Sequence, residues 1–225
     1  MVDYRKLRLN NLTSPEFRHL FLLLFGAFFG LCFWAMEQLI PRDYYYPMWC
    51  PLDNWIPFNE LFVIPYVFWF VFMVGVHVYL GLFDVAAFRR LMYFIMITYG
   101  SALVIFAIFP TCQNLRPTEF ARDNFLTRFM ADFYQFDTNT NVNPSLHVVG
   151  SMAVGIAACD TPRFQTKPWK AAFLGTAILI SISTVFVKQH SIIDTFCGFL
   201  MSGIAYILVY RLPNLQKKRA KSEAC

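Results

Sequence analysis

Apolar runs of 16 to 23 residues alternate with polar segments along almost the whole chain. An α-helix needs about 20 predominantly apolar residues to cross the hydrocarbon core of a bilayer. Prolines and charged side chains close most of the runs, because neither continues an apolar helix. The pattern predicts six membrane-spanning helices, at residues 20–40, 60–82, 91–109, 144–159, 171–187 and 189–210, of which the fourth is the shortest.

The longest connection, residues 111–143, carries a second pattern. An apolar face at helical spacing consists of Leu126, Phe129, Met130 and Phe133. The charged residues Arg122, Asp123 and Asp132 fall on the opposite face. This pattern is typical of an amphipathic helix that lies on the outer leaflet of a membrane. An ordinary helix packed within a loop remains an equal alternative.

Composition agrees with the hydrophobic pattern. The chain is 57% hydrophobic, 19% aromatic and only 15% charged, and its mean hydropathy is +0.47. These values lie far outside the range of soluble domains, so an integral membrane protein is expected. The 225 residues accommodate six spans with short connections and leave no room for a second domain. We therefore expect one all-α membrane domain, a six-helix bundle, over residues 1–225.

The distribution of Lys and Arg predicts the orientation. With both termini in the cytoplasm, 14 of the 19 basic residues lie on the cytoplasmic side, including those of the basic tail at 211–225. Cytoplasmic loops carry such an excess in most membrane proteins. The loop at 111–143 then lies outside the cell membrane. The net charge of +5 reflects this topology, and we expect membrane lipids as partners and no nucleic acid.

The six cysteines show no metal-binding pattern, because no CxxC or Cys/His spacing occurs. Cys50 and Cys112 both fall in predicted outer loops, so a disulfide between them is conceivable. Glu37, near the outer end of the first span, either lines a pocket or pairs with Arg42, and the pairing is favoured.

The segment from Asn143 to His147 reads NPSLH and opens the fourth apolar run. Asn143 can cap a helix there, and Pro144 suits its first position. Free backbone N–H groups of a first turn bind anions. Ser145 and His147 would stand beside such an anion, with His147 able to donate a proton.

His190 and Asp194 lie four residues apart, so they share one face of the sixth predicted helix. The carboxylate can fix the tautomer of the ring and leave its other nitrogen as nucleophile or base. The alternative is a structural pair, in which the two side chains only hydrogen-bond to each other within the bundle. Ionisable residues at membrane depth are costly and usually functional, however.

Two cations accompany the histidines on the outer side. Arg116 offers a planar fork for phosphate, and Lys188 supplies a point charge just before His190. A nucleophile, an acid for the leaving oxygen and fixed positive charge are what phosphoryl transfer requires. The sequence thus predicts phosphoryl-transfer chemistry at the outer face.

At these residues the chain resembles the type 2 phosphatidic acid phosphatase superfamily. That family carries a Lys six residues before Arg-Pro, then Pro-Ser-Gly-His, then Ser-Arg, five residues, His, three residues and Asp. The corresponding residues are Arg116 and Pro117, then Pro144, Ser145, Leu146 and His147, then Ser183, Thr184, His190 and Asp194. The order of motifs and the six-span layout agree with the family.

The resemblance implies a role for each matching residue. His190 would attack phosphorus and form a phosphohistidine, Asp194 would orient it, and His147 would protonate the leaving oxygen. Ser145 and Arg116 would bind phosphate oxygens. No metal or other cofactor is implied.

Three positions depart from the family pattern. Phe109 stands where the first Lys is expected, Thr184 replaces the Arg of the third motif, and Leu146 replaces Gly. Two phosphate-binding charges are thus missing, and Lys188 is a candidate replacement for one of them. A Pro-Ser-Leu-His motif is similar to that of inositol phosphorylceramide synthases, which transfer a phospho-headgroup to an alcohol.

The sequence therefore favours a membrane phosphatase for a phosphorylated lipid at the extracytoplasmic face. A lipid phosphotransferase with an alcohol acceptor is the alternative. From another class, a proton-coupled transporter or channel would use the histidines as a relay, and a haem-binding bundle using His77 is a distant third.

Overall fold

The computed structural model describes residues 2–40, 42–214 and 216. Helix accounts for 72% and strand for 2% of the structure, which confirms the predicted all-α class. Among these residues, five helical segments are long and apolar enough to cross a membrane: Arg18–Gln38, Glu60–Phe83, Val85–Ile108, Lys167–Phe186 and Ile192–Asn214. These segments indicate an integral membrane protein.

The long segments contain the main helices of the fold. These are α1 (Leu24–Gln38), α2 (Val63–Phe83), α3 (Val85–Ile108), α6 (Lys167–Phe186) and α7 (Ile192–Tyr206), which continues as a π-helical turn, Ile207–Arg211. The predicted fourth span corresponds to α5 (Leu146–Asp160), which has only 15 residues and is shorter than the length needed to span a bilayer unaided. The basic tail was predicted to begin at residue 211, but the last helical segment continues to Asn214. Residues 215 and 217–225 of the tail lie outside the described residues.

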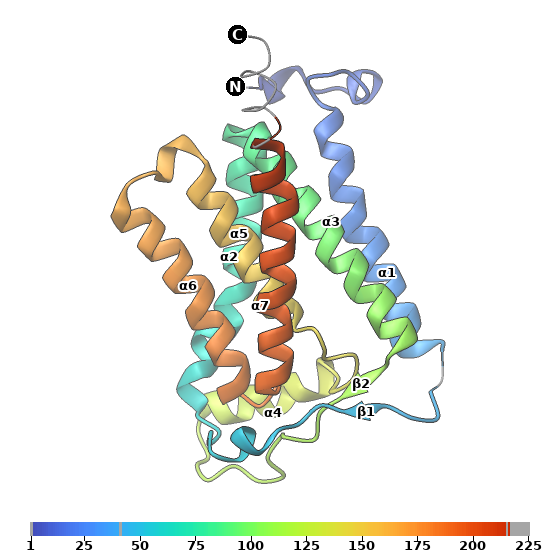
Figure 1. Cartoon of the computed structure of the whole chain (residues 1–225), viewed down its shortest axis with the longest axis vertical. Helices are drawn as coiled ribbons and strands as arrows, with labels where there is room; N and C mark the ends of the chain where they lie inside the picture. The colour runs from blue at the N-terminus through green and yellow to red at the C-terminus, as the bar shows by residue number, and fades with distance from the viewer. Residues whose placement is uncertain (1, 41, 215, 217–225) are drawn as a thin grey trace.

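Helix α5 stands at the centre of the bundle and contacts α2, α3, α6 and α7 (Figure 1). Its buried face is built largely from small residues, which allow close approach of neighbouring backbones. At Gly155, an added Cβ would lie 3.2 Å from Ala177 Cβ and 3.3 Å from the Phe173 carbonyl oxygen. The short central helix is therefore held by close packing on all sides.

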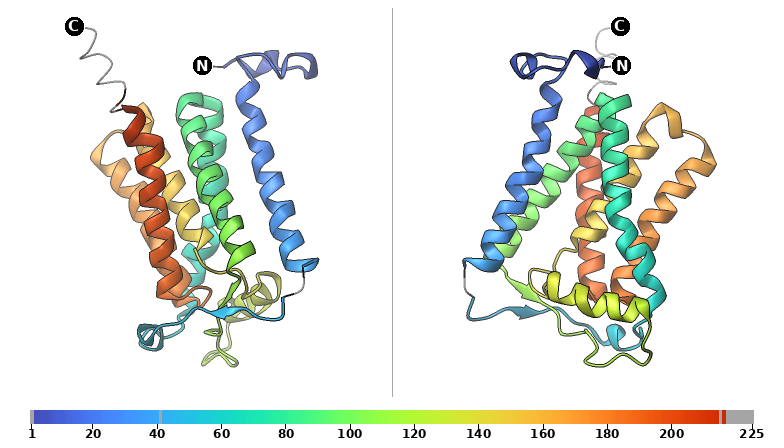
Figure 2. Two further views of the ribbon diagram at one scale, coloured as in Figure 1. Left: turned by 45° about the vertical axis from the view of Figure 1, so that its right-hand side comes forward. Right: turned by 180° about the vertical axis from the view of Figure 1, so that it is seen from behind.

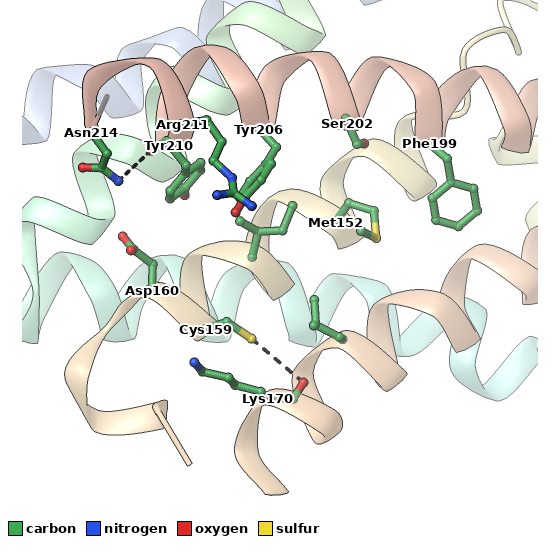
Figure 3. A pocket seen from close by; sticks show the side chains of 13 residues that line it. Met152, Cys159, Asp160, Lys170, Phe199, Ser202, Tyr206, Tyr210, Arg211 and Asn214 are labelled. Atoms are coloured by element: carbon green, nitrogen blue, oxygen red, sulfur yellow. Dashed lines mark hydrogen bonds between the residues drawn. The ribbon is translucent and has the colours of Figure 1, made fainter. Parts of the chain in front are cut away.

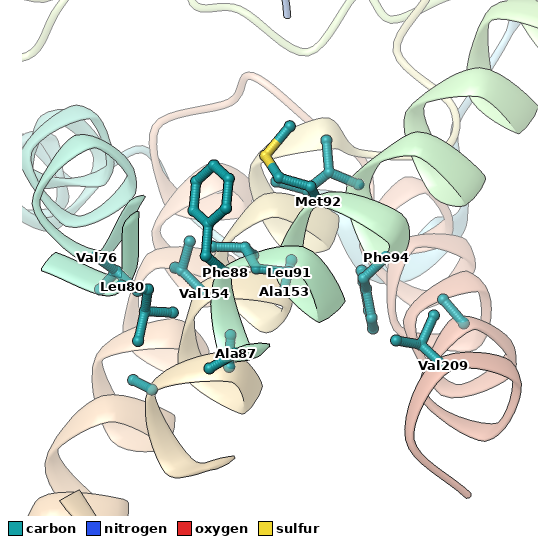
Figure 4. Packing of buried hydrophobic residues seen from close by; sticks show 14 of the residues in the cluster. Val76, Leu80, Ala87, Phe88, Leu91, Met92, Phe94, Ala153, Val154 and Val209 are labelled. Carbon is teal, nitrogen blue, oxygen red and sulfur yellow. The ribbon is translucent and has the colours of Figure 1, made fainter. Parts of the chain in front are cut away.

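The hydrophobic core lies where α2, α3, α5 and α7 meet (Figure 4). Large side chains from α2 and α3 pack against small ones from α5, and the labelled members are Val76, Leu80, Ala87, Phe88, Leu91, Met92, Phe94, Ala153, Val154 and Val209. Lipid tails are as apolar as these side chains, so the contacts stabilise the bundle mainly by van der Waals packing.

One end of the bundle, the α4 end, carries α4 (Phe125–Phe136) and two short parallel strands (Figures 1 and 2). Strand β1 (Tyr46–Pro47) pairs with β2 (Thr111–Cys112). Two-residue strands leave no periodic pattern in a sequence, so they were not predicted. The N-terminal helical turns and the end of α7 lie at the opposite end.

The predicted helix in the long connection is confirmed as α4. It begins later than expected from the charged residues assigned to its polar face. Asn124 caps it, so Arg122 and Asp123 precede the helix. Met130 is fully buried against the bundle, whereas Phe125 and Phe136 at its two ends are 75% and 82% exposed. The apolar face thus packs on the protein in its middle and is open at its ends.

The conceivable disulfide between the two loops predicted to be outer is absent. Cys50 and Cys112 are both free thiols, and the Cys112 Sγ lies 3.8 Å from the Tyr45 carbonyl oxygen. The segments that carry the two cysteines are instead joined through the β1–β2 pairing.

Candidate active site

A cavity of about 220 Å³ lies at the α4 end and contains both predicted catalytic histidines. We call it the histidine cavity. Six aromatic side chains form the largest apolar part of its wall: Phe29, Phe33, Trp69, Phe70, Phe133 and Phe136. The other lining residues are Asp137, Thr138, Thr140, Asn141, Val142, Leu146, His147, Gln189 and His190. The cavity therefore combines an apolar wall with a small polar patch.

His147 is held in the first turn of α5. The N-cap of this helix is Ser145, whose Oγ accepts a 3.5 Å hydrogen bond from the Val148 N–H, so the expected cap at Asn143 is wrong. Pro144 precedes the helix and follows a cis peptide bond, so it does not occupy the first helical position. The imidazole of His147 packs between Tyr66 and Trp69, with ring centroids 4.5 Å from each.

His190 lies in the tight turn between α6 and α7. Lys188 takes a left-handed conformation with φ 54°, which reverses the chain direction there. The N–H groups of Gln189 and His190 then both donate to the Thr184 carbonyl oxygen, at 2.9 and 3.2 Å. Thr184 therefore holds the backbone of the predicted nucleophile, although it lacks the charge of the family's Arg.

Asp194 lies behind His190, in the first turn of α7. Its Oδ2 is 3.6 Å from His190 Nδ1 and accepts a 2.9 Å hydrogen bond from the Ser191 N–H. The Asp194 side chain is fully buried. The 3.6 Å separation exceeds a normal hydrogen bond, but catalytic contacts in unliganded sites are often this long.

The two histidines come together because the starts of α5 and α7 are joined. The Ser145 N–H donates to the Asp194 carbonyl oxygen at 3.2 Å. The rings of His147 and His190 stand 5.9 Å apart at 62°. His147 Nε2, His190 Nδ1 and Asp194 Oδ1 are buried without a hydrogen-bond partner among the described residues. Buried polar atoms are almost always paired, so this concentration of unpaired atoms makes the cavity the candidate functional site.

Asp53 fixes the start of α7 from a distant loop. Its carboxylate accepts hydrogen bonds from Ser191 Oγ at 2.6 Å and from the Ile192 N–H at 2.9 Å. This contact was not predictable from the sequence, because Asp53 and Ser191 are 138 positions apart.

Lys188 does not line the histidine cavity. Its Nζ donates to the Asp53 carbonyl oxygen at 2.9 Å, so the ammonium group is directed to the Asp53 loop. Burial lowers the pKa of Lys188, and the neighbouring Asp53 carboxylate partly offsets this change. In this conformation the positive charge of Lys188 acts on the cavity only electrostatically, without direct contact.

Arg116 is likewise engaged by the protein. Its guanidinium donates to the carbonyl oxygens of Tyr134, Asp137 and Thr138 at 2.6 to 2.9 Å, and to Gln189 Oε1 at 2.5 Å. Gln189 itself lines the cavity. Arg116 thus organises the cavity wall from behind, and the three predicted phosphate-binding residues, Arg116, Ser145 and Lys188, all direct their polar groups to the protein.

Asp137 is a cavity residue that the sequence did not single out. Its Oδ2 accepts hydrogen bonds from Tyr66 Oη and Gln189 Nε2, both at 2.9 Å. Burial raises the pKa of the Asp137 carboxyl, against the opposing effects of Tyr66, His190 and Arg116. One feature of the sequence could have indicated Asp137: it is the first residue of the polar run that precedes the NPSLH segment.

Glu37 also serves this wall, so its expected pairing with Arg42 is wrong. The Glu37 carboxylate accepts hydrogen bonds from Thr138 at 2.8 Å, from Thr140 at 2.7 Å and from Asn141. Arg42 donates instead to the Ala107 carbonyl oxygen at 3.1 Å. Glu37 therefore links α1 to the cavity wall.

The arrangement provides one ring nitrogen backed by a carboxylate and a second imidazole 5.9 Å away. These groups can supply a nucleophile and a proton donor to one small substrate group. Within the described residues, no group of three or more His, Cys, Asp or Glu is placed to hold a metal ion.

Comparison with known proteins gives one match. A model of the PAP2 superfamily matches residues 90–218, a stretch that contains Arg116, His147, His190 and Asp194. No match is found among curated proteins or among solved structures.

Proposed function

The chain belongs to the PAP2 superfamily, whose members are phosphatases or phosphotransferases acting on phosphate esters, and from this premise we propose a lipid phosphatase. Its substrate is a phosphorylated lipid, and its reaction passes through a phosphohistidine at His190. The observation that carries the proposal is the pair of histidines on one cavity, with the Asp194 carboxylate behind His190.

In the first step, His190 attacks phosphorus. Asp194 faces Nδ1, which keeps the proton there and leaves the lone pair of Nε2 for the attack. The N–P bond forms while the P–O bond to the lipid breaks. His147 protonates the departing oxygen, so the products are a neutral lipid alcohol and phosphorylated His190.

In the second step, water attacks the phosphohistidine. His147, now neutral, takes a proton from the water, and the N–P bond breaks to release inorganic phosphate, which restores the neutral imidazole of His190 and the protonated imidazolium of His147. An alcohol in place of water gives phosphoryl transfer. Leu146 favours this second candidate, because an apolar side chain lines the cavity at the position where the family carries Gly.

Phosphate oxygens require donors, and the first-turn N–H groups of α5 are suited to this role because they lack intrahelical partners. Gln189 and Asn141 also line the cavity. Arg116 acts through Gln189, and Ser145 acts by capping α5. Lys188 contributes positive charge through space.

The proposed arrangement in the membrane follows the positive-inside pattern. Both termini lie in the cytoplasm of a cell-membrane protein, α5 counts as a sixth span, and α4 rests at the outer leaflet. The histidine cavity then opens at the extracytoplasmic face. Its aromatic wall suits the first part of a lipid chain, with the phosphate beside the histidines.

The test is a screen of phosphorylated lipids with purified protein, with and without alcohols such as inositol and glycerol. Free phosphate measures hydrolysis, and the mass of the lipid product measures transfer. His190→Ala is expected to abolish both activities. His77→Ala is the matched control, because His77 lies on α2, contacts the Met73 carbonyl oxygen at 2.7 Å and does not line the cavity. Full activity of His190→Ala would contradict the proposal.

A further inference from the structure

A second, larger hollow lies at the opposite end of the bundle, between α5, α6 and α7 (Figure 3). Its volume is about 570 Å³. We call it the distal groove. Asp160, which lines it, ends α5, and His147 begins the same helix. Thirteen residues of helix separate them, which corresponds to about 20 Å, so the distal groove is separate from the histidine cavity.

One part of the distal groove is cationic. Lys170 on α6 and Arg211 at the end of α7 both line it, and neither forms an ion pair within the described part of the chain. Its one carboxylate, Asp160, is already bound by Arg90, with Oδ2 at 2.5 Å from two guanidinium nitrogens. The guanidinium carbon of Arg211 lies 5.6 Å from the centroid of the Tyr206 ring, which also lines the groove. The polar part of the groove therefore carries excess positive charge.

A buried hydroxyl marks the same place. Tyr210 is only 6% exposed, and its Oη has no hydrogen-bond partner among the described residues. The side chain points from α7 toward α5, as Figure 3 shows. A buried hydroxyl without a partner is costly, so an unpaired donor in a groove that also holds two cations indicates that an anionic group belongs there.

The rest of the distal groove is apolar. Ile156, Leu174 and Phe199 line it from α5, α6 and α7, and all three are only partly buried by the protein. A soluble anion would gain no binding free energy from this apolar stretch. A chain of methylene groups would gain it, because it would bury the apolar surface. The groove thus presents a cationic part and an apolar part along helices that face lipid.

We propose that the distal groove binds an anionic phospholipid of the surrounding membrane. The headgroup phosphate lies between Lys170 and Arg211 and accepts a hydrogen bond from Tyr210, and an acyl chain covers the apolar stretch. Basic pockets between membrane helices bind anionic headgroups for these reasons. The site does not depend on the proposed reaction. With both termini in the cytoplasm, as proposed above, the distal groove lies in the cytoplasmic leaflet.

The test measures retained lipid by native mass spectrometry of the purified protein in neutral detergent, titrated with phosphatidylglycerol or phosphatidylcholine. The unchanged protein is expected to bind one phosphatidylglycerol in preference to phosphatidylcholine. The double variant Lys170→Ala, Arg211→Ala is expected to bind it about 30-fold more weakly, which corresponds to about 2 kcal/mol at about 1.4 kcal/mol per tenfold change. Tyr210→Phe should weaken binding about threefold to tenfold, as loss of one hydrogen bond would.

Two controls keep the result specific. Lys167→Ala removes an exposed cation on the same helix that does not line the groove, and it is expected to bind phosphatidylglycerol normally. His190→Ala is also expected to bind it normally, because its site lies at the other end of the bundle. Normal binding by the double variant would overturn the proposal, as would equal loss in Lys167→Ala, or no preference over phosphatidylcholine. The unfolding midpoint of each lipid-free variant confirms that it is folded.

Discussion

Gly198 is the point where α7 presses on the start of α5. An added Cβ would lie 2.9 Å from Val148 Cβ, 3.0 Å from Val148 Cγ1 and 3.2 Å from the Ser145 carbonyl oxygen. Ser145 and Val148 flank His147, and Gly198 lies one helical turn after Asp194. Replacing Gly198 with Ala should therefore move apart the two helices that hold the proposed catalytic residues.

The size of the effect follows from these distances. An ordinary contact begins at 3.4 Å, so α5 and α7 must separate by about 0.5 Å. Overpacking of this kind costs about 1–3 kcal/mol. A misplacement of about 1 Å can cost about 100-fold in rate, so about 0.5 Å predicts a loss on the order of tenfold in kcat.

The matched control is Gly203→Ala on the same helix, where nothing lies within 4 Å of the added Cβ. Both variants gain about 1 kcal/mol of helix propensity, so the difference between them isolates the overpacking. Thermal unfolding followed by tryptophan fluorescence should place Gly198→Ala lower by about 2–4 °C per kcal/mol of that difference. If Gly198→Ala were as stable and as active as Gly203→Ala, the close packing of α5 and α7 would not position the site.

Three further predictions concern the cavity. Asp194→Asn keeps the shape of the side chain but loses the charge behind His190, so kcat should fall by about 100-fold to 10,000-fold without loss of folding, as a turnover assay would measure. His147→Gln should slow hydrolysis of an alkyl phosphate far more than that of p-nitrophenyl phosphate, whose leaving group needs no proton; equal losses would remove His147 as the acid. Because burial raises the pKa of Asp137 in the folded protein, stability should fall as pH rises from about 4 through that raised pKa, and pH-dependent melting of Asp137→Asn should lack this fall.

The sequence predicted most of the helices because membrane spans leave long apolar runs. It also anticipated that His147, His190 and Asp194 would meet, since two helix starts on the same side of a bundle lie close together. It could not predict that α5 would be a short central helix, because close packing by Gly155 and its neighbours depends on the facing helices.

The second layer of the site was not predictable from the sequence. Asp53 and Asp137 act through partners more than 50 residues away, and such contacts leave no local pattern. The sequence also assigned Arg116 to phosphate on the basis of its charge, whereas its hydrogen bonds go to loop carbonyls and Gln189. Charge can be predicted from a sequence, but the direction of a long side chain is decided by tertiary packing.

The proposed mechanism requires that His190 carries the phosphoryl group during turnover. Incubation with a lipid labelled in its phosphate, followed by rapid quenching in alkali and peptide mapping, should give an alkali-stable, acid-labile label on His190. His190→Ala should give none, and His77→Ala should label normally. A label that persists in His190→Ala, or that maps to another residue, would contradict the mechanism.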